Sequence, residues 1–591
     1  MKRIFFWMTL GVVMLLASCK PESVTVTVVA TSDLETALLT HDYKYMGESR
    51  GGAALVADYL TELKSQCGEE GVVYVDNGDL LPGWPLNYYM KNIETTDTTL
   101  AAYALNALGC EVYGIGEGDL AQGKALVERH VKTMKGAPVC ANLVDAKSGA
   151  PVYKPYAVVE RNGMKIAFLG LITEAAPKYM NAVSLEGMKI ENAQAAAAKW
   201  VAEIKNNEAP DAIVGLFHMG ASSVSKRTKS RENMAVTIVR NVPGFDAVVC
   251  GHDGLRRSRT IDAANGKKVV LASPGRRGMY VVNIAITAER AGEGFKNKMV
   301  DVSIKPMISR SYDKEYSAAI RPVITDLRKS MSSTIATLKN NVGAVDALFG
   351  SSAYVDFVHK VQLENSGAEL SLVHPYNIKE GFGAGNLLLT DVNRFYPGRG
   401  KLYTIKLKGS EIRDMLTSSI SRFYRTVKDK DDVLLKYDDE RTRLTESTRG
   451  LESVAGLRYT VYADKMKKDE RVKILGLTNG RSFDLNKEYT VAVGEDYIMN
   501  ANLPLNIGAK VKSEDLQARV IAVSEKDMAE LVCEYIKEKK SLDLKPAGNW
   551  SLVPAAWIKS IKEKELRTLN RIYFPYADEM GVLPTDDAEI K

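Results

Sequence analysis

Cysteine is scarce in this sequence and follows none of the spacings that mark a cysteine-based site. The 591 residues include six cysteines, and the five beyond Cys19 contain no C-x-x-C pair. This excludes zinc-finger and thioredoxin-like redox proteins. Because their number is odd, at least one thiol is unpaired, and we expect all five to be small apolar residues of the interior: Cys67, Cys110, Cys140, Cys250 and Cys533.

The chain also lacks a strong excess of one charge, internal repeats and low-complexity segments. Its formal net charge is +6, and no basic patch with interleaved aromatic residues stands out. Because nucleic-acid-binding proteins carry such a patch, we expect no nucleic acid among the partners. Beyond the first 20 residues, no segment is long and apolar enough to span a bilayer.

The amino terminus carries the one long apolar run. Two basic residues precede it at residues 4–17, and it ends in the letters L-A-S-C, whose cysteine is Cys19. This ending resembles the bacterial lipobox, in which the cysteine is lipidated after cleavage. We predict a signal peptide at residues 1–18 and a protein in the cell envelope, outside the cytoplasm, that is attached to the membrane through lipidated Cys19. The alternative is an ordinary secretory signal followed by a chance cysteine.

The rest of the chain is too long for one hydrophobic core, so two large domains are expected. Between residues 19 and 310, strand-like apolar segments alternate with segments of helical spacing, which is typical of a layered α/β domain. A polar, charged stretch at 311–341 predicts a connecting helix. A second, smaller α/β domain is expected at 342–545, followed by a tail at 546–591 with a candidate amphipathic helix at 555–573.

Four strand-like segments of the first domain end in acidic or histidine residues. These residues are Asp33 with Glu35, Asp79, His218 and His252. In open α/β sheets, ligands bind at the carboxyl ends of the strands. Carboxylates together with imidazoles suit a divalent cation such as Mn, Zn or Fe. For each residue alone, the alternative is a hydrogen-bonded turn or loop residue.

Several short motifs resemble, in order and spacing, those of the bacterial 5′-nucleotidases. The resemblance covers nearly the whole mature chain, with these matches: Asp33 in D-x-H, Asp79 in G-D, 106–109 with N-A-L-G, 141–143 with A-N-L, His218 in H-x-G, His252 in G-H-x-H or G-H-x-Q, and 278–280 with G-x-Y. It implies an α/β chain with a four-layer, calcineurin-like metallophosphoesterase sandwich followed by a smaller α/β 5′-nucleotidase C-terminal domain. It also implies a divalent-metal site at Asp33, Glu35, Asp79, His218 and His252, and a nucleotide or another small phosphate ester as substrate.

Other positions depart from the family's metal-site motifs. Glu35 replaces the histidine of D-x-H, although a carboxylate can still bind a hard cation. The family's G-N-H-E-x-D is here G-I-G-E-G-D at 114–119, so Ile115 and Gly116 replace an asparagine ligand and the histidine that stabilises the transition state. Gly254 replaces the last histidine or glutamine ligand. The resemblance therefore implies an altered metal site.

The second domain retains part of the family's substrate-binding motifs. Asn377 and Lys379 lie where the family carries N-x-G-G-x-R, and Lys379 keeps the charge of that arginine but not its two-pronged guanidinium. Tyr497 lies in a segment similar to N-D-Y, whereas Leu451 replaces an aromatic residue that stacks on the base. The resemblance implies that Asn377, Lys379 and Tyr497 bind substrate without a base sandwich. Two tyrosines are alternative stacking residues, Tyr396 and Tyr424.

The sequence does not decide whether the protein is an enzyme, and three functions are compatible with it. The favoured one is a binding protein with weak or absent nucleotidase activity, because losing one positioned acid or charge-stabilising group typically lowers a rate about 10²- to 10⁴-fold. The second is an active metal-dependent phosphohydrolase in which Glu117 or Asp119 is the catalytic proton donor in place of the missing histidine. The third is an envelope interaction protein that uses the scaffold as a platform.

Overall fold

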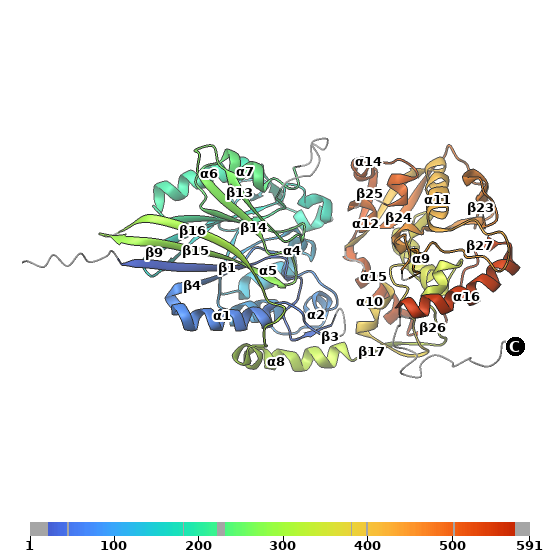
Figure 1. Cartoon of the computed structure of the whole chain (residues 1–591), viewed down its shortest axis with the longest axis horizontal. Coiled ribbons are helices and arrows are strands. Elements are labelled where there is room, and N and C mark those ends of the chain that lie inside the picture. The colour runs from blue at the N-terminus through green and yellow to red at the C-terminus, as the bar shows by residue number, and fades with distance from the viewer. Residues whose placement is uncertain are drawn as a thin grey trace, which may run out of the picture.

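The computed structural model describes residues 22–43, 47–180, 182–221, 231–292, 294–379, 381–397, 400–441, 443–499 and 503–573. Within these ranges the chain forms two α/β domains connected by helix α8 (Lys314–Met331), as Figure 1 shows. The predicted signal peptide and Cys19 lie outside the described residues. Among the described helices, none is both long and apolar enough to cross a membrane.

Two six-stranded sheets lie face to face in the N-terminal domain. Their strand orders are β16-β15-β1-β4-β5-β6 and β13-β14-β12-β11-β9-β8. The strands are β1 (Ser23–Thr31), β4 (Val72–Asp76), β5 (Cys110–Gly114), β6 (Ala137–Val139), β8 (Tyr156–Arg161), β9 (Met164–Ile172), β11 (Ala212–His218), β12 (Ala247–Cys250), β13 (Arg257–Asp262), β14 (Lys268–Ser273), β15 (Tyr280–Ala291) and β16 (Gly294–Pro306). Inward-facing side chains of both sheets, such as Val28 and Phe168, form one buried core.

Helices cover the outer face of each sheet. Helices α1 (Ala53–Cys67) and α3 (Leu100–Ala107) share a buried core with the outward side chains of β1 and β4. Helices α6 (Ala193–Asn207) and α7 (Ala235–Asn241) pack on β9 and β11 in the same way. The β-branched strands are therefore buried on both faces, which explains their nearly continuous apolar sequence. The predicted four-layer sandwich is confirmed.

The C-terminal domain is built on a five-stranded sheet of order β21-β18-β24-β20-β25. Its strands are β18 (Leu370–Val373), β20 (Lys401–Lys408), β21 (Ser453–Ala455), β24 (Glu488–Gly494) and β25 (Val520–Asp527). Helices α9 (Ala353–Ser366), α11 (Gly409–Phe423) and α15 (Met528–Lys539) flank it. The smaller α/β domain expected from the sequence is therefore present.

Two boundaries differ from the sequence prediction. The connecting helix ends at Met331, and β17 (Thr334–Leu338) already pairs with β19 (Gly385–Leu388) and β26 (Ser541–Leu542). The last three residues of β17 alternate between buried and exposed, as strand residues do. At the other end, β27 (Trp550–Val553) pairs with β22 (Leu457–Tyr462), so the tail is part of the C-terminal domain.

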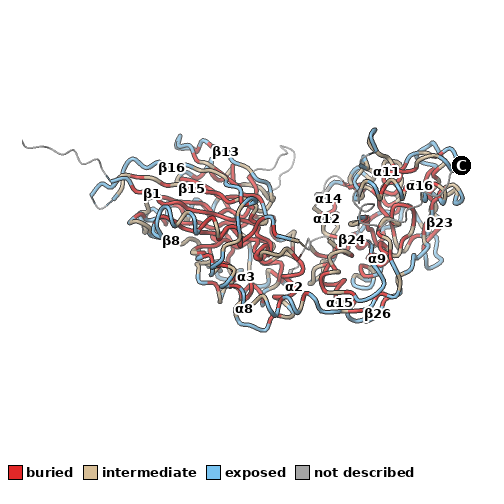
Figure 2. Tube along the Cα trace, turned by 60° about the horizontal axis from the view of Figure 1, so that its bottom comes forward, coloured by how far each residue is buried: buried red, intermediate tan, exposed pale blue. Residues whose placement is uncertain are grey.

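The expected helix of the tail, α16 (Ala555–Tyr573), packs against the C-terminal domain rather than standing apart from it. It has the predicted bounds, and its apolar residues Ile558, Ile561 and Leu569 join the core of that domain. Figure 2 shows the resulting buried core in each of the two domains.

The two domains touch along one side of a shared cleft. Lys401 Nζ donates to the carbonyl oxygen of Ala121 at 3.0 Å, and Tyr403 Oη donates to that of Lys178 at 2.8 Å. Lys91 of the first domain pairs with Glu530 of the second at 3.0 Å. A cleft of about 270 Å³ lies between the domains and is lined by residues from both. Five candidate functional residues of the first domain line this cleft: Asp33, Glu35, Asp79, Glu117 and His252.

Candidate metal centre

The ends of neighbouring strands bring five side chains together. Asp33 follows β1, Asp79 follows β4, His218 is the last residue of β11, and His252 follows β12. Glu117 begins helix α4 (Glu117–Ala121), which follows β5. Because β1, β4 and β5 run parallel to one another, as do β11 and β12, these residues meet at one edge of the sandwich. We call these five residues the metal centre.

Three residues of the centre have a left-handed backbone. The φ angle is 52° at Asp33, 57° at Asp79 and 70° at His252, and Glu35 also has a φ of 48°. Residues other than glycine rarely adopt this conformation, which costs on the order of 1–3 kcal/mol and is concentrated at functional sites. The turns after β1, β4 and β12 are therefore shaped to direct side chains toward the cleft.

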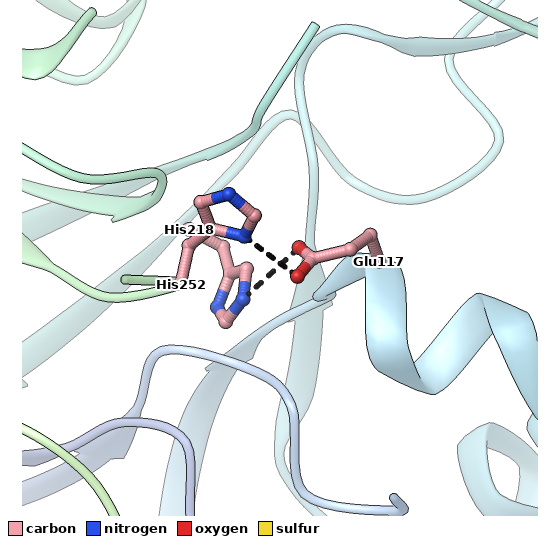
Figure 3. Close-up of side chains that lie close together, drawn as sticks. All are labelled: Glu117, His218 and His252. Carbon is pink, nitrogen blue, oxygen red and sulfur yellow. Dashed lines mark hydrogen bonds and ion pairs between the residues drawn. The ribbon is translucent and has the colours of Figure 1, made fainter. Parts of the chain in front are cut away.

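The carboxylate of Glu117 contacts both histidines (Figure 3). Its Oε1 is 2.6 Å from Nδ1 of His252, and its Oε2 is 3.2 Å from Nε2 of His218. His218 Nε2 is also 3.5 Å from Oδ2 of Asp79, while its Nδ1 is 2.8 Å from the carbonyl oxygen of Asn77. A backbone carbonyl that accepts from Nδ1–H directs Nε2 of His218 into the centre, as is usual for metal-binding histidines.

The donor atoms of the centre fit a divalent cation. Two overlapping groups each have ligand atoms within 4.8 Å of one another: Asp33, Asp79 and His218, and Glu117, His218 and His252. His218 Nε2 and Glu117 Oε2 are buried, and within the described part of the chain they face each other at 3.2 Å without forming a hydrogen bond of normal geometry. Buried polar atoms normally have hydrogen-bond partners, so these two atoms and the mixed oxygen and nitrogen donor set fit a site for a divalent cation.

The electrostatics of the centre depend on pairs of opposite charge. Burial alone would raise the pKa of the Glu117 carboxyl, but His252 and His218 outweigh it and hold that pKa well below its usual range. Burial would lower the pKa of His252, but Glu117 and Glu232 raise it to about 10. Burial raises the pKa of Asp33. A bound cation would therefore compete with protons for the imidazole nitrogens.

The comparisons with known proteins agree with this geometry. A family model described as "5'-nucleotidase, C-terminal domain" matches residues 334–502. A 2′,3′-cyclic-nucleotide 2′-phosphodiesterase/3′-nucleotidase of Haemophilus influenzae is 24% identical to this chain over an alignment of 591 positions. The alignment covers 89% of this chain and 87% of that protein. Residues 334–502 thus form the C-terminal domain of the 5′-nucleotidases, and the chain resembles such phosphoesterases over nearly its whole length. It combines the family's C-terminal domain with a calcineurin-like phosphoesterase domain at the N-terminus.

Solved structures show the same fold over nearly the whole chain. The NAD nucleotidase of Haemophilus influenzae superposes with a TM-score of 0.57 at 15% identity, covering 90% of this chain and 99% of that one. The 5′-nucleotidase precursor of Thermus thermophilus gives a TM-score of 0.52 at 19% identity, with 90% and 99% covered. The two-domain architecture is therefore that of this family.

Glu35, a predicted metal residue, belongs to neither group of close ligand atoms. It is buried and lines the cleft, and its backbone N–H donates to the carbonyl oxygen of Asp79 at 3.0 Å. Its own carbonyl oxygen accepts from Arg277 Nη1 at 3.4 Å. Glu35 thus connects the turns that carry Asp33 and Asp79, and its role as a ligand stays a prediction.

Asp119, predicted as a proton donor, is instead engaged by the backbone. Its Oδ2 accepts from the N–H groups of Asp79 at 2.8 Å and Gly116 at 3.0 Å, and its Oδ1 accepts from those of Leu80 and Leu81 at 2.9 and 2.8 Å. Burial raises the pKa of Asp119 to about 7. The side chain fixes the turn that carries Asp79, so a positioning role accounts for it better than proton donation.

The loop that carries Gly116 leaves no room for the family's histidine. A Cβ atom on Gly116 would lie 2.6 Å from the backbone nitrogen and 2.8 Å from Cγ of Asp79. Ile115, at the position of the lost asparagine ligand, is buried in the core. Glu117 is the residue of this loop that enters the centre, whereas the sequence predicted it only as a proton donor.

Several cleft residues were missed by sequence reasoning. Glu232 Oε1 is 3.2 Å from Nε2 of His252 and accepts a hydrogen bond from Tyr179, whose ring lies 5.2 Å from that of His252. No strand-end pattern marks either residue. Arg276 and Arg277, by contrast, follow β14, which is parallel to β12, so the strand-end rule that found His252 could have found them.

The three predicted substrate residues of the C-terminal domain do not line the cleft. Lys379 is exposed, and its backbone N–H donates to Oδ1 of Asn377 at 2.9 Å. Tyr497 is buried and donates a hydrogen bond to Glu452. The tyrosines considered for base stacking are also buried, Tyr396 and Tyr424. The C-terminal residues that do line the cleft are Asn393, Pro397, Gly400, Lys401, Glu495, Asp527 and Ala529.

Proposed function

We propose that this chain is a metal-dependent phosphoesterase that acts on small phosphate esters in the cleft between its domains. The observation that carries the proposal is the position of Glu117, which completes a five-residue donor set at the strand ends. The similarity to known phosphoesterases supports the reaction class, since the Haemophilus influenzae relative is a nucleotide phosphodiesterase and nucleotidase by name.

Asp33, Asp79, Glu117, His218 and His252 would hold the cation, which fits as Mn, Zn or Fe. When bound, such an ion stabilises the negative charge that develops on phosphoryl oxygens and lowers the pKa of water. The protein itself fixes these ligands through strained turns and through the carbonyl of Asn77. The surrounding cleft holds the substrate next to them.

The substrate class is broader than nucleotides with a recognised base. Leu451, Tyr497 and the two alternative tyrosines are buried, so they offer no exposed ring for stacking. We therefore expect little discrimination among bases and comparable activity on other phosphate esters of similar size. Nucleoside monophosphates and cyclic nucleotides are the first compounds to test.

A second candidate function is a binding protein with weak turnover. The specific observation is the tight packing of Gly116 on Asp79, which excludes the family's transition-state histidine from this loop. Losing such a group typically lowers the rate about 10²- to 10⁴-fold. In this version the same cleft binds phosphate esters and releases them largely unchanged.

We also propose that the protein is exported and anchored to a membrane of the cell envelope by lipidated Cys19. The support is the apolar segment at residues 4–17 and the lipobox-like ending at Cys19. Expression of the full chain with a labelled fatty acid tests this. Label and membrane association should both disappear in Cys19→Ala, and an unlabelled wild type would contradict the proposal.

The enzymatic proposal is tested by phosphate release with Mn²⁺ on nucleoside monophosphates, cyclic nucleotides and p-nitrophenyl phosphate. Asp79→Ala should abolish release, while Asp346→Ala, a surface acid of the C-terminal domain that pairs with Lys562, is the matched control. Turnover that persists in Asp79→Ala would contradict the proposal. Binding of the same compounds without turnover in the wild type would favour the second candidate.

A further inference from the structure

Arg276 fills the space beside Gly254, the position at which the family's last metal ligand is missing. A Cβ atom on Gly254 would lie 2.6 Å from Nε and 2.8 Å from Cζ of Arg276. Gly254 also has a φ of 62°, which side chains rarely accept. Glycine at 254 and arginine at 276 are therefore complementary, because any side chain at 254 would displace the guanidinium.

Arg276 differs from the other cations that line the cleft. Arg277 is 2.5 Å from Asp42, and Lys401 is 2.8 Å from Asp527. Within the described part of the chain, the guanidinium of Arg276 forms neither a hydrogen bond nor an ion pair, and the residue is exposed. A structural arginine at a cleft full of carboxylates would be expected to pair with one of them. The charge of Arg276 remains available to a ligand.

The position of Arg276 selects the kind of ligand. It lines the same cleft as Asp33, Asp79 and His252, and Gly254, which it packs against, is two residues beyond His252. The guanidinium is planar, always charged and shaped to donate two parallel hydrogen bonds to a phosphate. A tetrahedral oxyanion bound at the metal centre would therefore share the cleft with the guanidinium of Arg276.

We propose that Arg276 binds the phosphoryl group of the substrate directly and so supplies a fixed positive charge at the position where the family uses a further metal ligand. This role of Arg276 adds a substrate contact to the proposed phosphoesterase function. It rests on that function, because both place the phosphoryl group in the same cleft. It assigns to Arg276 the anion contact that the sequence had assigned to Lys379.

Equilibrium binding of orthophosphate, measured by titration calorimetry on the Mn²⁺-loaded protein, tests the proposal without relying on turnover. Arg276→Met should weaken binding about 10- to 100-fold, the usual range for a hydrogen bond to a charged group. Arg276→Lys should restore only part of the loss because it lacks the fork. Arg256→Met is the matched control: Arg256 is exposed on the same side, but its guanidinium lies 4.2 Å from the Tyr280 ring and outside the cleft.

Gly254→Ala provides an independent second arm. Its added Cβ meets the movable end of Arg276 and should push the guanidinium away, so phosphate binding should weaken about as much as in Arg276→Met. The double variant should lose no more than either single variant, because both changes remove the same contact. Thermal unfolding of each variant shows whether the fold is retained.

Phosphate affinity that is unchanged in Arg276→Met, additive losses in the double variant, or no phosphate binding by the wild type would each overturn the proposal. The outcome is separable from that of the enzymatic proposal. Turnover with an unchanged phosphate affinity in Arg276→Met would overturn only the role of Arg276. Arginine-dependent phosphate binding without any turnover would support Arg276 and contradict the phosphoesterase activity.

Discussion

Each domain of this protein buries a histidine among carboxylates, and the two arrangements differ in access. In the metal centre, Glu117 contacts both His218 and His252, and Glu117 and His252 line the cleft between the domains. In the C-terminal domain, His374 Nε2 is 3.1 Å from Oδ2 of Asp496 and its Nδ1 is 3.7 Å from Oε1 of Glu452. The second arrangement, together with Tyr497, is here called the C-terminal polar cluster.

Tyrosines close off the C-terminal polar cluster. The rings of Tyr376 and Tyr497 lie 4.4 and 5.5 Å from the ring of His374. His374 lines neither the cleft at the metal centre nor the described cavity beside helix α9. Burial would lower the pKa of His374, but Asp496 and Glu452 raise it to about 9. A shifted pKa and close carboxylates therefore do not make a site; a path for the ligand is also required.

The largest expected effect separates the two clusters by activity. Asp79→Ala should lower kcat/KM for any substrate the wild type hydrolyses by at least about 10²-fold, because it removes a donor of the centre. Removal of metal with a chelator should have the same effect, and re-addition of Mn²⁺ should restore only the wild type. Steady-state kinetics with and without chelator measure this. Turnover that persists in the presence of chelator would contradict the prediction that activity depends on metal bound at the metal centre.

The second prediction concerns stability. His374→Gln should leave kcat/KM within about 2-fold of the wild type, yet lower the free energy of unfolding by about 3 kcal/mol, since it leaves buried carboxylates without their cation. Urea unfolding followed by circular dichroism gives the stability. A variant that unfolds like the wild type but loses activity would mean that the C-terminal polar cluster is functional after all.

A third prediction contrasts two buried histidines of the C-terminal domain. Within the described residues, the imidazole of His359 forms hydrogen bonds with two hydroxyl groups, Ser371 Oγ and Ser453 Oγ, each at 2.9 Å, and burial lowers its pKa to about 3. Its folded pKa is below the usual 6.5, so its contribution to stability is complete above pH 6.5 and is lost as pH falls toward 3. For His374 the folded pKa is raised, so its contribution is complete below pH 6.5 and is lost as pH rises through about 9.

The stability difference between the wild type and His359→Gln should therefore shrink by roughly 1 kcal/mol per pH unit below pH 6.5. The difference for His374→Gln should instead shrink above pH 6.5. Urea unfolding at a series of pH values checks both directions in one experiment. Parallel pH profiles for the two variants would contradict this account.

The smallest expected effect concerns the residues that the sequence assigned to substrate binding. Lys379→Ala should change KM by less than about 2-fold, because Lys379 is exposed and does not line the cleft. Arg276→Met should raise KM for the same substrate about 10-fold or more, in line with its expected loss of phosphate affinity. A large rise in KM for Lys379→Ala alone would show that the C-terminal domain binds substrate away from the described cleft.

Much of this molecule could be predicted from the order of its residues. The β-branched strands and their polar ends predicted a layered α/β domain and four members of the metal centre, because parallel strands place their carboxyl ends at one edge. The four-layer sandwich was predicted from the resemblance to the 5′-nucleotidases. The role of Glu117 could not be predicted, since it depends on the loop conformation that Gly116 permits. The burial of Tyr497 could not be predicted either, because the local sequence does not distinguish a tyrosine in the core from one in a binding site.

The contact between Gly254 and Arg276 joins residues 22 positions apart, and only the folded chain reveals it. The same holds for Glu232 and Tyr179, which reach His252 from segments without a recognisable pattern. When a motif lacks a ligand residue, the structure is therefore needed to decide whether another residue takes its place.

The amount of bound metal per chain tests most directly whether Glu117 belongs to a metal centre. The protein would be loaded with Mn²⁺, washed and analysed by elemental mass spectrometry, with Glu117→Gln, Asp79→Ala and His374→Gln in parallel. We predict at least one equivalent in the wild type and in His374→Gln, and a clear loss in the other two variants. No metal in the wild type, or full retention in Glu117→Gln, would contradict the account.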